Sequence, residues 1–400
     1  MNRIFLVLIL TNFSFNIYCM EPEYQTQRPM KCLNPELFSF RWNLRSVALS
    51  HDGKLAVSGG VLYAPTLQGC LQFWDVNAEP SKIPGPRFYL GPAVKAKYSR
   101  LWRGYDITTV DLSPYGKVVA VGAKEMGKSA VIGLWCTAKG KLLRTLQQED
   151  GEIGQNIDSV LYDPTGKLLA GVSFGDVRLW NVETGELVRK FKNASTCADF
   201  SSDGRFLAVG GRSVARVHDG RDGQEHEYSV GFAGHEYKTT ADDMRDGTHV
   251  IEQPFAWTRI FDVESGEVVQ ESKGSGGNIT SLRMGADGIT TLNNGGVVRV
   301  VGPDESSPNT VKQPQYDKKK HEQPTHLSVD GRLAVAVHAL GGMRVLDLAS
   351  DTKPDARLTH RLTSPQKYIV SVAFSGNGKS VSVGLQGGEV QIWDLHKEQK

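Results

Sequence analysis

An internal repeat constrains this chain more than any other feature. Eight segments share a short alternating run, a turn that carries glycine and a second apolar run. The turn glycines are Gly53, Gly116, Gly166, Gly204, Gly247, Gly288, Gly331 and Gly378. Most of them are separated by roughly 40–45 residues, a period typical of a unit of four short strands. Asp-Gly or Asn-Gly occupies six of the eight turns. Because glycine tolerates positive φ, each turn is predicted to close a β-hairpin.

A third strand is predicted after each hairpin. In chain order these third strands end in FWD at Asp75, LWC at Cys136, LWN at Asn181, VHD at Asp219, IFD at Asp262, VVG at Gly302, VLD at Asp347 and IWD at Asp394. After several of them a second turn recurs, with Gly140, Gly185, Gly223 or Gly266, and a fourth apolar run follows. The repeating unit is therefore predicted to be a four-stranded antiparallel sheet.

The Trp-Asp dipeptides at Trp74-Asp75 and Trp393-Asp394 resemble the signature of the Trp-Asp (WD) repeat family. The resemblance covers nearly everything from about residue 36 onward, and the other third strands look like decayed copies. It implies an all-β, closed β-propeller that serves as a protein-interaction scaffold. Only Gly234-His235 supplies the Gly-His pair that usually opens a blade, and the buried Asp of the family is missing. The Trp–Ser/Thr–His–Asp network of the family is therefore expected to be absent from most blades.

Closure into a ring is expected because a lone four-stranded sheet buries too little apolar surface to fold. Eight blades are the preferred count, and seven are the alternative if the fifth or sixth repeat is only a distorted connection. The eight-bladed quinoprotein type is a further possibility. The last repeat ends without a fourth strand, so residues 37–42 are predicted to complete the last blade. The predicted organisation is an export signal at 1–19, an N-terminal extension at 20–35 and one propeller at 36–400.

The N-terminus resembles an export signal. Arg3 precedes an unbroken apolar run at residues 4–10, and a mixed stretch ends at Cys19. Seven apolar residues are too few to span a bilayer, and no later segment looks membrane-spanning. We therefore expect an exported protein that is secreted, periplasmic or in the cell envelope. The net charge of +2 argues neither for nor against a nucleic-acid or membrane partner, and no nucleic-acid partner is expected.

Two motifs imitate catalytic sites. Residues 122–129 match the phosphate-loop pattern GxxxxGKS, but this pattern requires a following helix, whereas a third strand is expected here. His321 and His326 resemble a metalloprotease pair, but they are five residues apart and Pro324 lies between them. Cys32, Cys70, Cys136 and Cys197 lack zinc-site spacing, and the last three are expected to be buried thiols. No catalytic residue, metal or cofactor is predicted.

The long connection 81–107 is the first candidate binding surface. It interleaves basic and aromatic residues, and no acidic residue occurs before Asp106. Such a mixture suits protein interfaces and anionic or flat ligands. The candidate partner-binding residues are Lys95, Lys97, Tyr98, Arg100, Trp102, Arg103 and Tyr105. The alternative is a structural insertion whose aromatic residues pack on their own blade.

A recurring arginine is the second candidate. It stands two residues before the Trp-equivalent position in five repeats: Arg178, Arg216, Arg259, Arg299 and Arg344. Because a repeated position in a ring lies at a repeated radius, these residues could form a basic annulus. The alternative is that each arginine pairs with acidic neighbours from adjacent blades or is solvated.

The predicted function is non-catalytic. The short glycine turns follow first and third strands, whereas the long inserts follow second and fourth strands and so gather on the other face. We expect a monomeric scaffold that binds one or more protein partners through the face with the long loops. The alternatives are a cofactor-dependent or hydrolytic propeller enzyme and a propeller that binds an anionic polymer.

Overall fold

The computed structural model describes residues 31–33, 42–63, 67–76, 99–103, 105–125, 130–147, 156–173, 176–192, 197–211, 214–219, 224–229, 249–275, 278–285, 288–293, 298–301, 311–312, 322–328, 330–338, 342–348, 358–363 and 368–395. Within these ranges all regular secondary structure consists of β-strands. In the same ranges there is no helix with the length and apolar character needed to cross a bilayer.

The strands of the described ranges form seven antiparallel sheets, which we number along the chain. The first sheet contains β2 (Trp42–Leu49), β3 (Leu55–Tyr63), β4 (Leu67–Asp75) and β5 (Ser99–Arg103). The second contains β6 (Tyr105–Leu112), β7 (Val118–Glu125), β8 (Val131–Cys136) and β9 (Lys141–Gln147). The third contains β10 (Ile157–Tyr162), β11 (Leu168–Ser173), β12 (Asp176–Asn181) and β13 (Leu187–Lys192).

The fourth sheet has six strands: β14 (Cys197–Phe200), β15 (Phe206–Gly210), β16 (Val214–Asp219), β17 (Gln224–Ser229), β18 (His249–Asp262) and β19 (Val268–Ser275). The fifth contains β20 (Ile279–Gly285), β21 (Gly288–Asn293), β22 (Val298–Val301) and β23 (Val311–Lys312). The sixth contains β24 (Glu322–Leu327), β25 (Leu333–His338), β26 (Gly342–Asp347) and β27 (Leu358–Thr363). The seventh contains β28 (Ile369–Phe374), β29 (Ser380–Leu385), β30 (Val390–Asp394) and β1 (Lys31–Leu33).

The hairpin predictions from the repeat are confirmed wherever the residues are described. The turn glycines Gly53, Gly116, Gly166, Gly204, Gly331 and Gly378 have φ between 66° and 73°. The second-turn glycines Gly140, Gly185 and Gly266 have φ between 58° and 79°. Residues with a Cβ adopt this left-handed region only at a cost, so glycine at these places fixes where the chain reverses.

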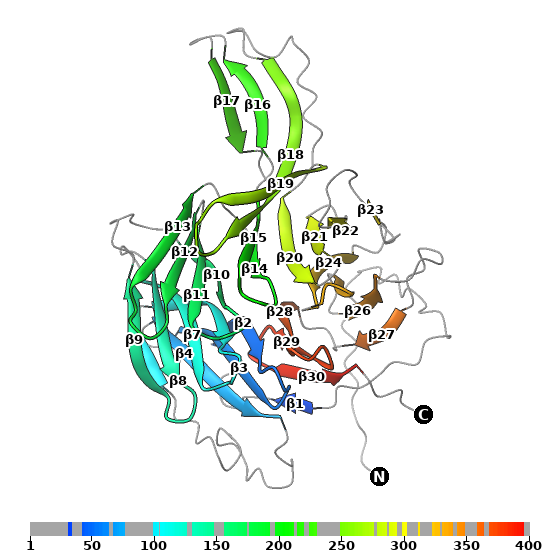
Figure 1. The fold of residues 1–400 in the computed structure, drawn as a ribbon. Coiled ribbons are helices and arrows are strands. Elements are labelled where there is room, and N and C mark those ends of the chain that lie inside the picture. Colours follow the sequence, from blue (N-terminus) through cyan, green and yellow to red (C-terminus); the bar gives the residue numbers. More distant parts are fainter. Residues whose placement is uncertain are drawn as a thin grey trace, which may run out of the picture.

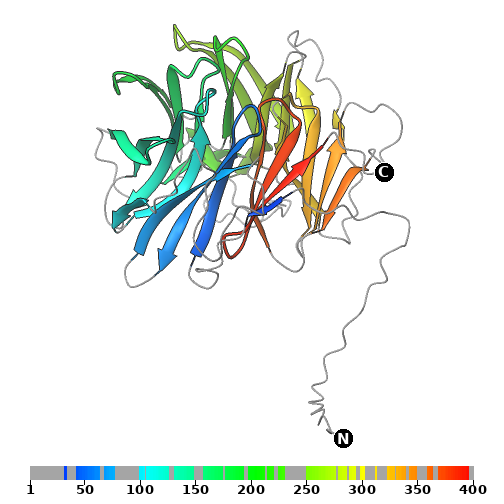
Figure 2. The same ribbon diagram turned by 90° about the horizontal axis from the view of Figure 1, so that it is seen from below.

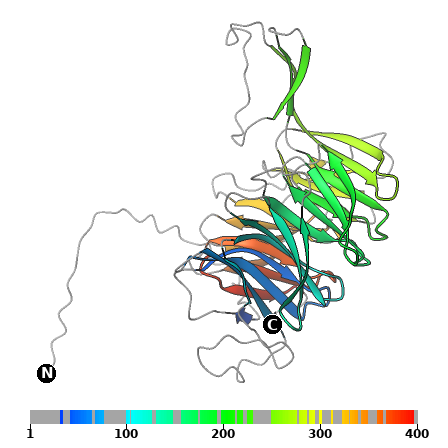
Figure 3. The same ribbon diagram turned by 90° about the vertical axis from the view of Figure 1, so that its left-hand side faces the viewer.

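The expectation of a separate sheet for each of eight repeats is wrong at the fourth and fifth repeats. The predicted third strand of the fourth repeat, β16, pairs instead with β17 and with the first half of β18. The second half of β18 pairs with β15, from Phe206↔Asp262 to Gly210↔Thr258. One long strand thus serves both as the true third strand and as the base of an inserted hairpin, which projects away from the other sheets (Figures 1 and 3).

The strand that completes the last sheet is not the predicted one. Lys31–Leu33 pairs with β30, with Cys32 opposite Gln391. Trp42, which was expected to end the closing strand, begins β2 and lies opposite Leu62. The buried Leu44 anchors β2 inside the core, and residues 34–41 lie outside the described ranges. The sheet-forming part of the chain therefore includes Lys31–Leu33 and does not begin at residue 36.

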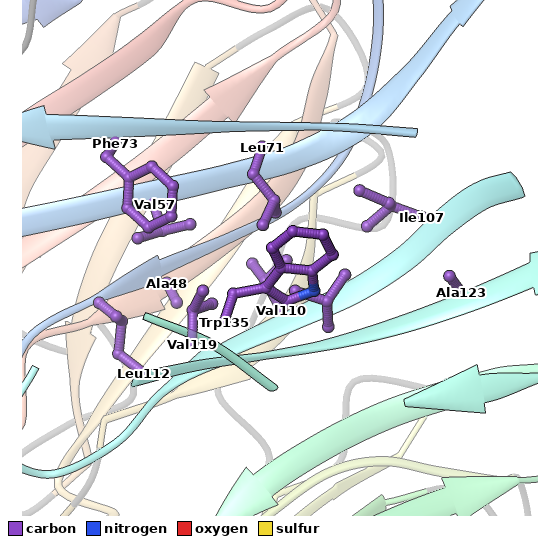
Figure 4. Packing of buried hydrophobic residues seen from close by; sticks show 11 residues of the cluster. Ala48, Val57, Leu71, Phe73, Ile107, Val110, Leu112, Val119, Ala123 and Trp135 are labelled. Atoms are coloured by element: carbon purple, nitrogen blue, oxygen red, sulfur yellow. The ribbon is translucent and has the colours of Figure 1, made fainter. Parts of the chain in front are cut away.

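Apolar side chains join each sheet to the next. In the cluster between the first and second sheets, Val57, Leu71 and Phe73 pack against Val110 and Trp135 (Figure 4). Similar clusters join the second sheet to the third, the third to the fourth, the fourth to the fifth, the fifth to the sixth and the sixth to the seventh. Burial of such side chains stabilises by about 1.5–3 kcal/mol each, so neighbouring sheets supply much of each sheet's stability.

The seventh sheet also packs against the first. Val390 and Ile392 share a buried cluster with Leu44, Val47 and Trp74. Figure 2 shows the red strands of the seventh sheet next to the blue strands of the first. The amide of Val47 donates a hydrogen bond of 3.1 Å to Ser371 Oγ. Segments from opposite ends of the chain are therefore held together by apolar and polar contacts.

Candidate interaction site

Four of the hairpin turns between first and second strands are built alike. The Leu55 amide donates to Ser50 Oγ at 2.9 Å, and Ser50 Oγ donates to Asp52 Oδ1 at 2.7 Å. The Lys54 amide also donates to Asp52 Oδ1, at 3.1 Å. The same pattern recurs in three other turns: Ser201 with Asp203, Ser328 with Asp330 and Ser375 with Asn377. We call the surface that carries these turns the turn face; its local structure is fixed by hydrogen bonds within each turn.

The opposite surface, which we call the loop face, carries the connections that follow second and fourth strands. First strands begin at this face, and several side chains near their first residues are exposed. Arg45 and Asp106 form an ion pair of 3.1 Å between the first and second sheets. At the start of β28, the side chains of Tyr368 and Val370 are 63% and 38% exposed. An aromatic ring, an aliphatic group and an ion pair therefore lie on this face beside the connections that lead into first strands.

The predicted basic and aromatic insert is partly a regular strand. Arg100, Trp102 and Arg103 belong to β5, where Arg103 lies opposite Gln68 and Trp102 opposite Gly69. Tyr105 begins β6 and packs against the apolar cluster of the first and second sheets. The remaining residues of this prediction, Lys95, Lys97 and Tyr98, lie outside the described ranges.

Four of the five recurring arginines share one position, and the fifth does not. Arg178, Arg259, Arg299 and Arg344 lie on third strands, at register positions opposite Gly171, Val209, Thr291 and Ala336. Arg216 lies in the inserted hairpin on β16, opposite Glu227 and Glu252, so it leaves the predicted annulus.

Two of these arginines have described partners. Arg178 is 2% exposed, lies 3.6 Å from Asp176 and donates to Ser173 Oγ at 3.3 Å. Arg259 lies 2.5 Å from Glu271, and its guanidinium stacks over the Trp257 ring at 3.9 Å. Both acidic partners belong to the same sheet as their arginine and not to an adjacent sheet.

Neither the phosphate-loop pattern nor the histidine pair has the structure that its chemistry requires. Gly122 and the three residues after it end strand β7, residues 126–129 lie outside the described ranges, and β8 begins at Val131. A strand therefore stands where a phosphate loop needs a helix. His326 lies in strand β24, and in the described ranges no group of three or more His, Cys, Asp or Glu residues is placed to hold a metal ion.

A cluster of titratable side chains was missed by sequence reasoning. Asp111, Asp199, Arg283 and His326 occupy the same place in four different first strands, two residues before the residue that opens the turn. We call them the inner polar cluster, because first strands lie toward the middle of the molecule and fourth strands at its outside (Figure 1). Each of them stands five residues before its turn glycine, so comparison of this position across the repeats was the available sequence signal.

The two carboxylates of the inner polar cluster bridge neighbouring sheets. Asp111 Oδ2 accepts a hydrogen bond of 2.9 Å from the Tyr162 amide of the next first strand. Asp199 Oδ2 accepts one of 2.9 Å from the Met284 amide. First strands are the edges of their sheets, so these amides would otherwise lack a partner in the sheet ladder. The carboxylates supply it, and they tie each edge to the sheet before it.

Burial shifts the proton affinities of this cluster. Burial raises the pKa of Asp111 to about 6, although the Tyr162 and Leu112 amides and the Arg283 charge oppose the shift. Burial also raises the pKa of Asp199, against the Arg283 guanidinium 3.5 Å away. For His326, burial and the charge of Arg283 lower the pKa to about 4. Near pH 7 Asp111 is therefore mostly ionised and the His326 imidazole is neutral.

One link of the Trp–Ser/Thr–His–Asp network is present in the first sheet. Trp74 Nε1 donates a hydrogen bond of 3.1 Å to Ser58 Oγ. In the third and seventh sheets the register places Gly171 and Val383 where Ser58 stands, so Trp180 and Trp393 meet no hydroxyl at that position. This agrees with the expected decay of the network.

Comparison with known proteins finds a distant relative of this chain. No protein-family model matches the chain. A segment of 210 residues, 50% of this chain, is 25% identical to protein groucho of Drosophila melanogaster. The chain is thus a distant homologue of a WD-repeat protein, and its four-stranded antiparallel sheets are consistent with WD repeats. The match spans only 26% of the length of groucho.

Proposed function

We propose that the chain is a non-catalytic seven-bladed β-propeller that binds a protein partner through its loop face. The proposal of a closed ring is supported by the apolar clusters that join each sheet to the next, including the seventh to the first. It is also supported by the Val47–Ser371 hydrogen bond between the two ends of the chain. Because each sheet has neighbours on both faces, closure leaves no end blade exposed.

The contrast between the two faces is the observation that carries the binding role. On the turn face, repeated hydrogen bonds from serine to aspartate or asparagine shape the turns between first and second strands, and most of these turns have the same length. On the loop face, connections vary in length and adjoin Tyr368, Val370 and Arg45. Variable loops on a rigid scaffold are where recognition residues usually lie. The likeness to groucho favours a protein-binding, non-catalytic role in the same way.

The basic and aromatic insert follows third strand β4 and leads into fourth strand β5, not out of a fourth strand as expected, so it belongs to the turn face and is a candidate surface separate from the loop face. Aromatic side chains and arginine are enriched at the centres of protein interfaces. The N-terminal apolar run after Arg3 supports export, so we propose that the partner is met outside the cytoplasm.

Matched surface variants test the proposed face. The variant Arg45→Ala/Tyr368→Ala removes a charge and an aromatic ring from the loop face. The variant Lys54→Ala/Tyr115→Ala removes the same kinds of group from the turn face, where Tyr115 is 76% exposed. Affinity capture with quantitative mass spectrometry should show a specific partner that the loop-face variant loses and the turn-face variant keeps. Loss in the turn-face variant alone would reject the assignment.

A further inference from the structure

Three neighbouring outer strands carry an exposed aliphatic residue at one repeated position. Leu143, Val188 and Val269 lie on β9, β13 and β19, and they are 56%, 47% and 53% exposed. Each is the extra residue of a β-bulge. For example, Trp180 pairs with Leu187 and Leu179 pairs with Arg189, so Val188 is skipped. The bulge itself does not require an apolar residue, because Thr359 is skipped in the same way on β27.

Hydrogen bonds also link β9 and β13 each to the turn before the next outer strand. Arg144 Nη2 on β9 donates to the Glu183 carbonyl at 2.9 Å, in the turn that leads into β13. Arg189 Nη2 on β13 donates to the Glu264 carbonyl at 2.5 Å, in the turn that leads into β19. Leu187 and Val268, 41% and 48% exposed, extend the apolar surface beside the bulges. We call the five aliphatic residues the outer patch: Leu143, Leu187, Val188, Val268 and Val269.

The charges around the outer patch change sign from one end to the other. Among the side chains that the structure describes beside β9, the exposed charged residues are basic: Lys139, Lys141 and Arg144. Among those described beside β19, they are acidic: Glu264, Glu267 and Glu271. On β13, between them, exposed Glu186 is followed by half-buried Arg189 and Lys190. The patch thus has a basic end and an acidic end with aliphatic groups in the middle.

We propose that a second copy of this chain docks on the outer patch. A two-fold rotation through β13 places the basic β9 end of each copy against the acidic β19 end of the other. Such an isologous contact needs a surface that complements itself, and the opposite ends of this patch do so. Long lysine and glutamate side chains can reach across a convex rim, and the aliphatic groups between them lose water. This dimer replaces the expectation of a monomer and leaves the loop face accessible.

The bulges shape the contact as well. A bulge interrupts the row of main-chain groups at the edge of a sheet and so hinders edge-to-edge strand pairing. The two copies are therefore held by side chains and not by a continuous sheet. Contacts between partly exposed charges weaken as salt screens them, so the dimer is expected to dissociate more readily at high ionic strength.

Charge reversal at each end tests the dimer by sedimentation velocity of the full chain. Lys139→Glu/Lys141→Glu makes both ends acidic, and Glu264→Lys/Glu267→Lys makes both ends basic. Like charges then oppose each other in either variant alone, and each dissociation constant should rise at least about tenfold. An equimolar mixture of the two variants has complementary ends again, so it should recover the wild-type dimer.

The controls separate this contact from misfolding and from other surfaces. Far-ultraviolet circular dichroism and the melting temperature should be unchanged, because every substituted side chain is exposed. Lys54→Glu/Lys117→Glu, on the turn face, should dimerise like the wild type. A wild-type chain that sediments as a monomer up to about 100 µM would overturn the proposal. Reversed variants that dimerise normally, or a mixture that does not recover the dimer, would overturn it equally.

Discussion

At the scale of single residues, the inner polar cluster is the least expected feature. Asp111 and Asp199 accept amide hydrogen bonds from the next sheet, yet both remain costly to ionise where they lie. His326 is held neutral in the same region. Raised acid pKa values and a lowered histidine pKa affect stability in opposite directions as pH falls. Their effects on the stability of the wild type therefore partly cancel.

Asp111→Asn should change how stability depends on pH. The pKa of Asp111 is about 6 when folded and near 3.8 when unfolded, so the folded state holds the proton more tightly. Its contribution is full below pH 3.8 and is lost as pH rises through 6. Acidification from pH 7 to 4.5 should therefore stabilise the wild type relative to Asp111→Asn by about 2 kcal/mol. Urea unfolding at both pH values measures this difference, and parallel pH dependences would contradict it.

His326→Gln should have the opposite effect. The pKa of His326 is about 4 when folded and near 6.5 when unfolded, so its contribution is full above 6.5 and is lost as pH falls through 4. The glutamine side chain does not titrate in this range, so the variant has no such contribution to lose on acidification. Between pH 7 and 4.5 the variant should therefore be destabilised less than the wild type, by about 2 kcal/mol. The same urea titrations check this, and a variant as acid-sensitive as the wild type would show that His326 is not the neutral, buried group described.

At the scale of strands and turns, Gly185 meets two requirements: a positive φ angle and space for the neighbouring Arg144 side chain. Gly185 has φ 79°, and a Cβ there would lie 2.5 Å from Arg144 Cδ, the side chain that ties the second sheet to the third. Gly378 has φ 68° with no heavy atom within 4 Å of such a Cβ. The two glycines have similar φ angles, but a Cβ would meet neighbouring atoms only at Gly185.

Gly185→Ala and Gly378→Ala should therefore separate the two effects. Gly378→Ala should cost about 1 kcal/mol, from backbone strain alone. Gly185→Ala should cost about 1–2 kcal/mol more, because Arg144 must move and its hydrogen bond to Glu183 is lost. Thermal unfolding of both variants gives the comparison. Equal losses would mean that the Arg144 contact adds nothing to the junction between these sheets.

Strand β1 allows a second test at this scale. A chain that begins at Lys31 keeps the strand that pairs with β30, whereas a chain that begins at Glu36 lacks it. Only the shorter chain should lose stability, by about 2–3 kcal/mol, because the edge beside the buried Val390 and Ile392 becomes exposed. Chemical denaturation of both chains decides this; equal midpoints would leave β1 without a structural role.

The elements also show how far sequence reasoning reached. Hairpins, third strands and turn glycines followed from local rules, since a tight turn and an alternating run are encoded within a few residues. The repeat at Gly247 misled because an Asp-Gly pair also fits an insertion, and nothing local reveals that β18 pairs with both β15 and β16. The inner polar cluster was missed because its members are brought together only when separate first strands assemble. Arg178 could not be assigned from sequence, because its partners depend on burial and register.

At the scale of the whole molecule, stability should be shared among the sheets. Each apolar cluster takes residues from two sheets, so unfolding one sheet exposes a face of the next. We expect a single cooperative transition in scanning calorimetry, with van't Hoff and calorimetric enthalpies that agree. A separate low-temperature transition would show that some sheets unfold on their own.

The inserted hairpin shows how such an architecture can gain new parts. Between β15 and the second half of β18 the chain leaves its sheet, forms β16 and β17, and returns to the register it would have had without them. Growth at this point adds a new arm while the neighbouring sheets keep their packing. Foreign segments grafted between Gly210 and Phe255 should therefore be accommodated, which makes this junction a natural place to acquire a second recognition element without rebuilding the core.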